Sequence, residues 1–222
     1  MRRLSSSLDR ACIYFQRIFP TDDIILRPGT GKTVTIVESI LQILHQQPNA
    51  KILACAPSNS AADILAQRLL SLTPEEMFRC NAAFRIPITV PEELAPYTHR
   101  KGYHYSLPSL NTLAQYKVIV TTCVNASFAY NIGIPGGHFT HVFVDEAGQA
   151  SEPEVLVPIK PLAQAHTRII LSGDPKQLGP VIRSSIAREF GLAKSYLERL
   201  METALYSDET GRGRTYAHPF VA

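Results

Sequence analysis

The sequence lacks any apolar run approaching the roughly 20 residues that a membrane-spanning helix needs, although it is 222 residues long. Residues 1–7 contain two arginines and three serines, but the apolar core of a signal peptide does not follow them. Both absences argue against a membrane or secreted protein. We therefore expect a chain that is soluble and cytoplasmic.

Cysteine is scarce and shows no metal-binding spacing. No CxxC pair occurs among the four cysteines, which are Cys12, Cys55, Cys80 and Cys123. Two of them lie in apolar runs typical of buried strands, so core thiols in a reducing compartment are expected. His138 and His141 also lack a cysteine or carboxylate at ligand spacing, and we predict no structural metal.

A strong charge imbalance is missing as well. The formal net charge is +3 and the isoelectric point is about 8.7, which permits a nucleic-acid partner without indicating one. Hydrophobic residues make up 45% of the chain. That share and the chain length are enough to bury one good core, which predicts a folded domain rather than a disordered chain.

Short apolar runs alternate with helix-length amphipathic stretches along most of the sequence. The expected strands are 24–26, 52–56, 118–121, 141–144 and 168–171, and the expected helices are 32–45, 61–70, 153–162 and 194–201. This alternation predicts an α/β fold with a mostly parallel sheet and helices on both faces. The folded lobe is expected over 24–205, between a poorly defined segment 1–23 and an extended tail 206–222. Five prolines in residues 73–116 predict an irregular insertion there.

The segment after the first expected strand has the composition of a phosphate-binding loop. It consists of Pro28, Gly29, Thr30, Gly31, Lys32 and Thr33. Backbone N–H groups and the positive end of the following helix suit phosphate, Lys32 adds a full charge, and Thr33 offers a hydroxyl to Mg²⁺. A glycine-rich turn that binds no nucleotide is the alternative.

One position departs from the usual phosphate-loop pattern. Leu26 stands where the first glycine is expected, and Arg27 follows it. If that position requires a positive φ or a close backbone approach, Leu26 costs on the order of 1 kcal/mol or more. We therefore expect a recognisable but weakened nucleotide site.

A second segment places two acids at the end of an apolar run. Residues 142–144 are apolar, and Asp145 and Glu146 follow them directly. In ATP hydrolysis a metal neutralises phosphate charge and a base orients the attacking water, so Asp145 is the candidate metal ligand and Glu146 the candidate base. A strand that ends in a solvated acidic turn is the alternative.

A third loop follows the apolar run 169–171. It covers residues 173–180 and contains Gln177. Loops at strand ends carry the chemistry of α/β sheets, and an amide can contact both a γ-phosphate and the attacking water. Gln177 is therefore a candidate catalytic and phosphate-sensing residue, although such a loop alone is often only a turn.

Five ordered segments together resemble motifs I, Ia, Ib, II and III of superfamily 1 helicases. They lie at residues 28–33, 56–63, 120–123, 145–150 and 173–180. The most specific resemblance is to the Armitage-type RNA-silencing helicases. It rests on residues 147–154, which follow Asp145 and Glu146, and on the later stretch 191–200. The nonsense-mediated-decay helicase and senataxin are similar relatives.

The resemblance implies a RecA-like P-loop NTPase lobe that binds ATP and Mg²⁺ in an ATP-dependent RNA helicase. It also implies contacts with the sugar-phosphate backbone of single-stranded nucleic acid, RNA rather than DNA, by Ser58, Asn59, Ser60, Thr121 and Thr122. Hydroxyl and amide groups can bind phosphates without reading bases. The alternative for residues 58–60 is helix capping alone. Ribonucleoprotein partners would fit such a protein.

Two features of the family have no match in this sequence. The adenine-reading glutamine motif is absent from residues 1–25, and no second lobe with arginine fingers follows. We therefore expect a truncated motor with little activity alone, since an arginine finger contributes roughly 10³ to 10⁵ in rate. The alternative is a non-catalytic remnant that binds nucleic acid or protein, whereas a small P-loop kinase is disfavoured because no lid or acceptor site is evident.

Overall fold

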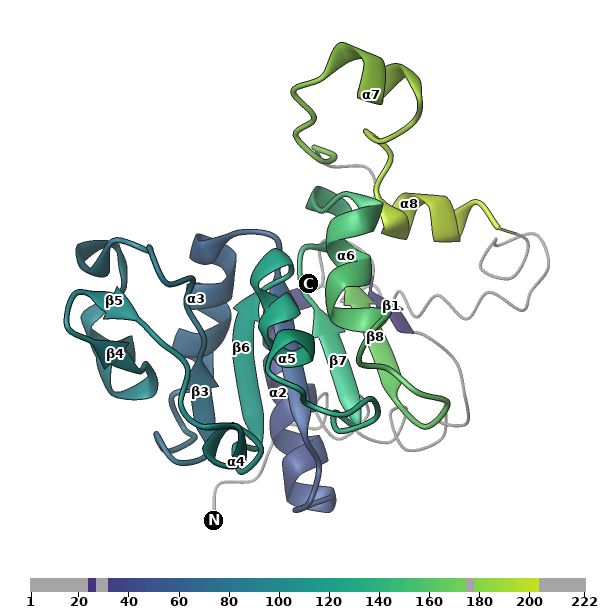
Figure 1. The fold of residues 1–222 in the computed structure, drawn as a ribbon. Helices are drawn as coiled ribbons and strands as arrows, with labels where there is room; N and C mark the ends of the chain where they lie inside the picture. The colour runs from purple at the N-terminus through teal and green to yellow at the C-terminus, as the bar shows by residue number, and fades with distance from the viewer. Residues whose placement is uncertain (1–23, 27–31, 175–177, 204–222) are drawn as a thin grey trace, which may run out of the picture.

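The computed structural model describes residues 24–26, 32–174 and 178–203, and within them a six-stranded parallel sheet forms the centre. The strands are β1 (Ile24–Leu26), β2 (Ile52–Ala56), β3 (Met77–Arg79), β6 (Val118–Thr122), β7 (His141–Val144) and β8 (Arg168–Ser172). Their spatial order is β1-β8-β7-β2-β6-β3 (Figure 1). The predicted α/β fold with a parallel sheet is thus confirmed.

Helices cover both faces of this sheet (Figure 1). On one face lie α2 (Lys32–Gln46) and α3 (Asn59–Arg68), and on the other lie α5 (Ser127–Asn131), α6 (Glu152–Ile159) and α8 (Tyr196–Met201). Helix α2 buries Ile36, Ile40 and Ile43, whose spacing places them on one side of the helix. Along β7, Phe143 joins the core under α2, while Val142 and Val144 join the opposite core. The alternation along the strands and the helical spacing of apolar residues therefore account for the two hydrophobic cores, one on each face of the sheet.

The insertion is less irregular than its prolines suggest. Its first part forms β3, a fully buried edge strand that pairs with β6. The expectation of an irregular segment from residue 73 is therefore wrong for β3, because three residues are too short to show an alternating pattern. The remainder contains the 3₁₀ turns η1 (Pro87–Thr89) and η2 (Glu92–Tyr97), the hairpin β4 (Arg100–Lys101) and β5 (His104–Tyr105), and α4 (Leu110–Leu113).

All six strands of the sheet run in the same direction, so the loops that follow them gather at one edge. After β6 comes the turn η3 (Val124–Ala126), and after β7 comes η4 (Ala147–Gln149). The short helix α7 (Ser185–Glu189) buries no residue and stands apart from the sheet in Figure 1. No helix in the described part of the chain combines the length and apolarity needed to cross a membrane.

Three of the four cysteines, Cys55, Cys80 and Cys123, are buried and free, whereas Cys12 lies outside the described residues. Burial raises the pKa of the Cys80 thiol to about 11 and that of Cys123 to about 12. These thiols therefore stay protonated at neutral pH, as expected for core residues.

Candidate functional site

The start of α2 meets the end of β7 at the centre of the sheet edge. Thr33 Oγ1 donates a hydrogen bond of 3.0 Å to Asp145 Oδ2, although the two residues are 112 positions apart. Asp145 is only 2% exposed. The fold thus brings together the two side chains that the sequence suggested as Mg²⁺ ligands.

The N-terminus of α2 carries positive charge that the helix itself does not neutralise. Lys32 is its first residue, and no acidic residue lies in its first turn. The first N–H groups of a helix have no partner within the helix, and together with the dipole of this 15-residue helix they favour an anion at this end. The rest of the expected phosphate loop lies outside the described residues; it consists of Pro28, Gly29, Thr30 and Gly31.

Glu146 occupies a strained position beside Asp145. Its backbone is left-handed, with φ 54° and ψ 35°, which is uncommon for a residue other than glycine. Its N–H donates to Asp145 Oδ1 at 3.0 Å, and its carboxylate accepts from Gln149 Nε2 at 3.2 Å. The residue is therefore held in one orientation at the end of β7.

The electrostatic surroundings of Glu146 favour its protonated form. Burial raises the pKa of its carboxyl above the ordinary value, and the negative charges of Asp145 and Asp174 raise it further. Lys32 acts in the opposite direction. A carboxylate with a raised pKa is a better proton acceptor at neutral pH than an ordinary one.

The loops after β7 and β8 touch through their backbones. A Cβ atom on Gly148 would lie 2.6 Å from the carbonyl oxygen of Asp174, and one on Gly173 would lie 2.6 Å from the backbone nitrogen of Gly148. Glycine is therefore required at both positions. This contact was not predicted, although both glycines were visible within their motifs. Gln177, the third candidate catalytic residue, lies outside the described residues.

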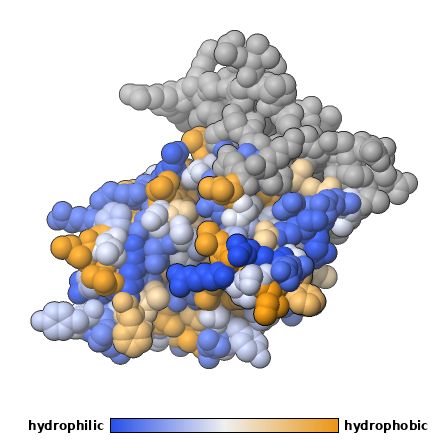
Figure 2. All heavy atoms as spheres, turned by 90° about the horizontal axis from the view of Figure 1, so that it is seen from above, coloured by the Kyte–Doolittle hydropathy of each residue, from blue (hydrophilic) through white to orange (hydrophobic). Residues whose placement is uncertain are grey.

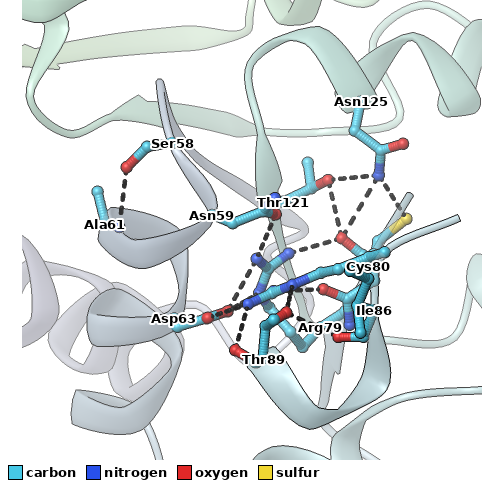
Figure 3. Close-up of polar contacts among 12 residues, drawn as sticks. Ser58, Asn59, Ala61, Asp63, Arg79, Cys80, Ile86, Thr89, Thr121 and Asn125 are labelled. Atoms are coloured by element: carbon cyan, nitrogen blue, oxygen red, sulfur yellow. Dashed lines mark hydrogen bonds and ion pairs between the residues drawn. The ribbon is translucent and has the colours of Figure 1, made fainter. Parts of the chain in front are cut away.

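The segment after β2 is exposed at the same edge of the sheet. Figure 3 shows Ser58 and Asn59 at the start of α3. Ser58 Oγ accepts a hydrogen bond of 3.1 Å from the backbone N–H of Ala61 and caps α3. Helix capping, considered from the sequence as an alternative role, therefore occurs at Ser58. Asn59 and Ser60 are also exposed, so all three could reach a ligand.

The candidate nucleic-acid contact at Thr121 needs correction. This side chain is 0% exposed, donates to the carbonyl oxygen of Cys80 at 3.1 Å, and accepts from Asn125 Nδ2 at 3.0 Å. It therefore links the end of β6 to the chain that follows β3, and it does not face solvent. The sequence did not reveal this because β3 itself was not expected. Thr122 is half-buried and accepts from the N–H of Asn125 at 3.3 Å.

A buried ion network joins the insertion to α3, and the sequence analysis missed it. Asp63 accepts from Arg79 Nε at 3.0 Å and from Arg85 Nη1 at 2.9 Å (Figure 3). The side chains of Arg79, Asp63 and Arg85 are 0%, 7% and 6% exposed. An arginine within the apolar run around Met77 was the only available signal, because a buried arginine requires an acidic partner.

Comparisons with known proteins show the family of this chain. Residues 20–88 and 107–185 match the AAA domain family, and the gap between them falls in the insertion. The RNA helicase Mov10l1 of Homo sapiens is 47% identical over 195 residues, covering 86% of this chain and 16% of that protein. The probable RNA helicase armi of Drosophila melanogaster is 34% identical over 205 residues, covering 83% of this chain and 17% of that protein.

Among solved structures, the UvsW helicase of bacteriophage T4 aligns over 86% of this chain and 57% of that chain, with a TM-score of 0.49 and 13% identity. The chain spans about a sixth of the length of the human and Drosophila relatives.

Proposed function

Because the chain belongs to the AAA domain family and to the Armitage-type helicases of superfamily 1, we propose that it is the ATP-binding motor lobe of an ATP-dependent RNA helicase. The observation that carries this proposal is the hydrogen bond between Thr33 and Asp145 beside the N-terminus of α2. It supports a single site in which phosphate and metal are bound together.

The residues at this site fit a Mg²⁺-nucleotide. The hydroxyl of Thr33 and the carboxylate of Asp145 are oxygen donors of the kind that Mg²⁺ prefers. Lys32 and the end of α2 supply positive charge for phosphate oxygens. When bound, Mg²⁺ would neutralise charge on the phosphates during hydrolysis.

Glu146 is the base in this proposal. Its carboxylate accepts a proton from the water that attacks the γ-phosphate, and its raised pKa brings its affinity for that proton closer to neutral pH. Gln149 and the backbone bond to Asp145 hold Glu146 in place. Gln177 is proposed to contact the same phosphate, as expected from its motif.

The exposed residues Ser58, Asn59 and Ser60, together with Thr122, are proposed to contact the backbone of single-stranded nucleic acid, with RNA favoured over DNA. The human and Drosophila relatives are both named RNA helicases, which supports RNA as the nucleic acid that is bound. Hydroxyl and amide groups bind phosphate oxygens without selecting a base. The proposal also includes coupling of ATP hydrolysis to strand translocation, ribonucleoprotein partners and a cytoplasmic location.

A non-catalytic module that binds nucleic acid or protein is the second candidate. Leu26 favours it, because this side chain replaces the first glycine of the phosphate loop. In this case the lobe would keep its fold and its exposed segment after β2 but would bind ATP weakly or not at all.

Calorimetry with Mg²⁺ and a non-hydrolysable ATP analogue separates the two candidates. We expect the parent chain to bind and Lys32→Ala to lose about tenfold or more in affinity, because a hydrogen bond to a charged group contributes roughly 1.5–3 kcal/mol. Lys160→Ala, at the exposed C-cap of α6, is the matched control and should bind like the parent. Equal affinities for Lys32→Ala and the parent would contradict the nucleotide site.

A further inference from the structure

The loop that follows β3, residues 80–86, lies between two segments of the proposed nucleic-acid face. On one side, Arg79, the residue before the loop, donates from Nη2 to Asn59 Oδ1 at 3.4 Å, within the exposed segment 58–60. On the other side, the carbonyl oxygen of Cys80 accepts from Thr121 Oγ1 at 3.1 Å and from Asn125 Nδ2 at 3.4 Å. Figure 3 shows these contacts converging on this loop. The loop is therefore physically continuous with both segments.

Hydrogen bonds clamp this loop at both ends and near its middle. Arg79, directly before the loop, and Arg85, near its end, share the buried carboxylate of Asp63. Arg85 Nη1 also donates to Asn81 Oδ1 at 2.7 Å, and the N–H of Tyr105 donates to the carbonyl oxygen of Ala83 at 3.2 Å. A loop held in this way presents its side chains in a fixed direction at little cost in entropy on binding.

Phe84, near the end of this loop, is nonetheless 85% exposed. Its only ring contact among the described residues is with His104, edge to face, at a centroid distance of 5.4 Å and an angle of 76°. This geometry leaves most of the phenyl ring open to solvent. Ile86 and Ile88 beside it are also exposed, and Figure 2 shows hydrophobic side chains at the left margin, where Figure 1 places the insertion.

The charge of the ion network at this loop favours a polyanion. Two guanidinium groups, those of Arg79 and Arg85, face one carboxylate, that of Asp63, so the network carries an excess of one positive charge. The arginines' own donors are bonded within the protein, so the excess charge acts through the local field. Phe84 is exposed and directly precedes Arg85 in the sequence, and an open aromatic ring near positive charge suits a nucleobase flanked by phosphates.

We propose that Phe84 stacks on a base of the single-stranded nucleic acid whose backbone lies along residues 58–60, and that Asp63 is the positioning residue that holds its loop. This inference rests on the proposed function, which it extends from backbone contacts to base stacking. Stacking on an aromatic ring tolerates any base, since every base has a π-face. The insertion thereby acquires a role in single-strand binding.

The chain contains no tryptophan, so a single introduced tryptophan reports on its own surroundings. Phe84→Trp should lose at least about half of its emission when a single-stranded RNA oligonucleotide saturates it, because stacked bases quench indole fluorescence. Phe190→Trp is the matched control, since Phe190 is 87% exposed at the C-cap of α7, which lies away from the insertion. Its emission should not change.

Binding of a dye-labelled RNA, followed by anisotropy at low salt, gives a second readout. Phe84→Ala should weaken binding by roughly five- to a hundredfold, whereas Phe190→Ala should bind like the parent. Both alanine variants should retain the parent's midpoint of thermal unfolding, because both side chains are exposed. Parental RNA affinity in Phe84→Ala, together with unchanged emission in Phe84→Trp, would overturn the stacking proposal and leave the proposed function intact. Absence of RNA binding by the folded parent chain would overturn both.

Discussion

The buried network around Asp63 allows a sharp prediction about stability. Both oxygens of its carboxylate are used, since Oδ1 accepts from Arg79 and Arg85 and Oδ2 accepts from Arg85. Asp63→Asn keeps one acceptor oxygen and points amide donors at a guanidinium group. Two buried cations then lose their only carboxylate in this network. Breaking a buried pair in this way costs about 3–5 kcal/mol, a large part of the total stability of about 5–15 kcal/mol typical of a domain.

Urea unfolding followed by far-ultraviolet circular dichroism measures this cost. The matched control is Glu76→Gln, because Glu76 pairs with Lys117 at 2.9 Å but the two side chains are 31% and 39% exposed. An exposed pair contributes about 1 kcal/mol or less, so Glu76→Gln should move the midpoint only slightly. If Asp63→Asn were no more costly than Glu76→Gln, our account of this network as the anchor of the insertion would be refuted.

Three further predictions concern stability and are each testable by thermal or urea unfolding. Ser172→Ala should stabilise the chain by about 1 kcal/mol, because Ser172 Oγ is buried without a hydrogen-bond partner among the described residues. A loss of stability would contradict this and show that the hydroxyl has a partner. Glu146→Gln should raise the free energy of unfolding at pH 7, because the raised pKa of Glu146 makes its ionisation oppose folding. This gain should vanish below about pH 4, where the carboxyl is protonated in both states, and an equal gain at both pH values would contradict the prediction. Burial lowers the pKa of His141 to about 4, so the free energy of unfolding should fall as the pH drops from about 6.5 towards 4. His141→Phe should flatten this pH dependence, and an unchanged dependence in the variant would contradict the prediction.

The central part of the site was predictable because parallel strands end at one edge of a sheet. Thr33 and Asp145 each follow a strand that the apolar pattern reveals, and their motifs assign both to one ligand. The sequence alone could therefore suggest that they meet, and the structure gives the hydrogen bond that joins them. The left-handed backbone of Glu146 was beyond prediction, since a glutamate seldom adopts this conformation and nothing in the motif signals it.

The outer part of the site was less predictable because it depends on β3. This three-residue strand lies between prolines, and its two apolar residues followed by Arg79 are too few to show an alternating pattern. Without β3, Thr121 seemed free to contact a ligand, and the partners of Asp63 could not be identified. Such long-range pairings depend on tertiary contacts that short propensity patterns do not carry.

A crystal structure of the chain with Mg²⁺ and a non-hydrolysable ATP analogue tests the central proposal most directly. We expect the phosphates at the N-terminus of α2 beside Lys32, with Mg²⁺ held by Thr33 Oγ1 and by Asp145 directly or through water. The carboxylate of Glu146 should face the γ-phosphate. A nucleotide bound elsewhere, or a metal without contact to Thr33 and Asp145, would contradict the assignment of this lobe as an ATP-binding motor.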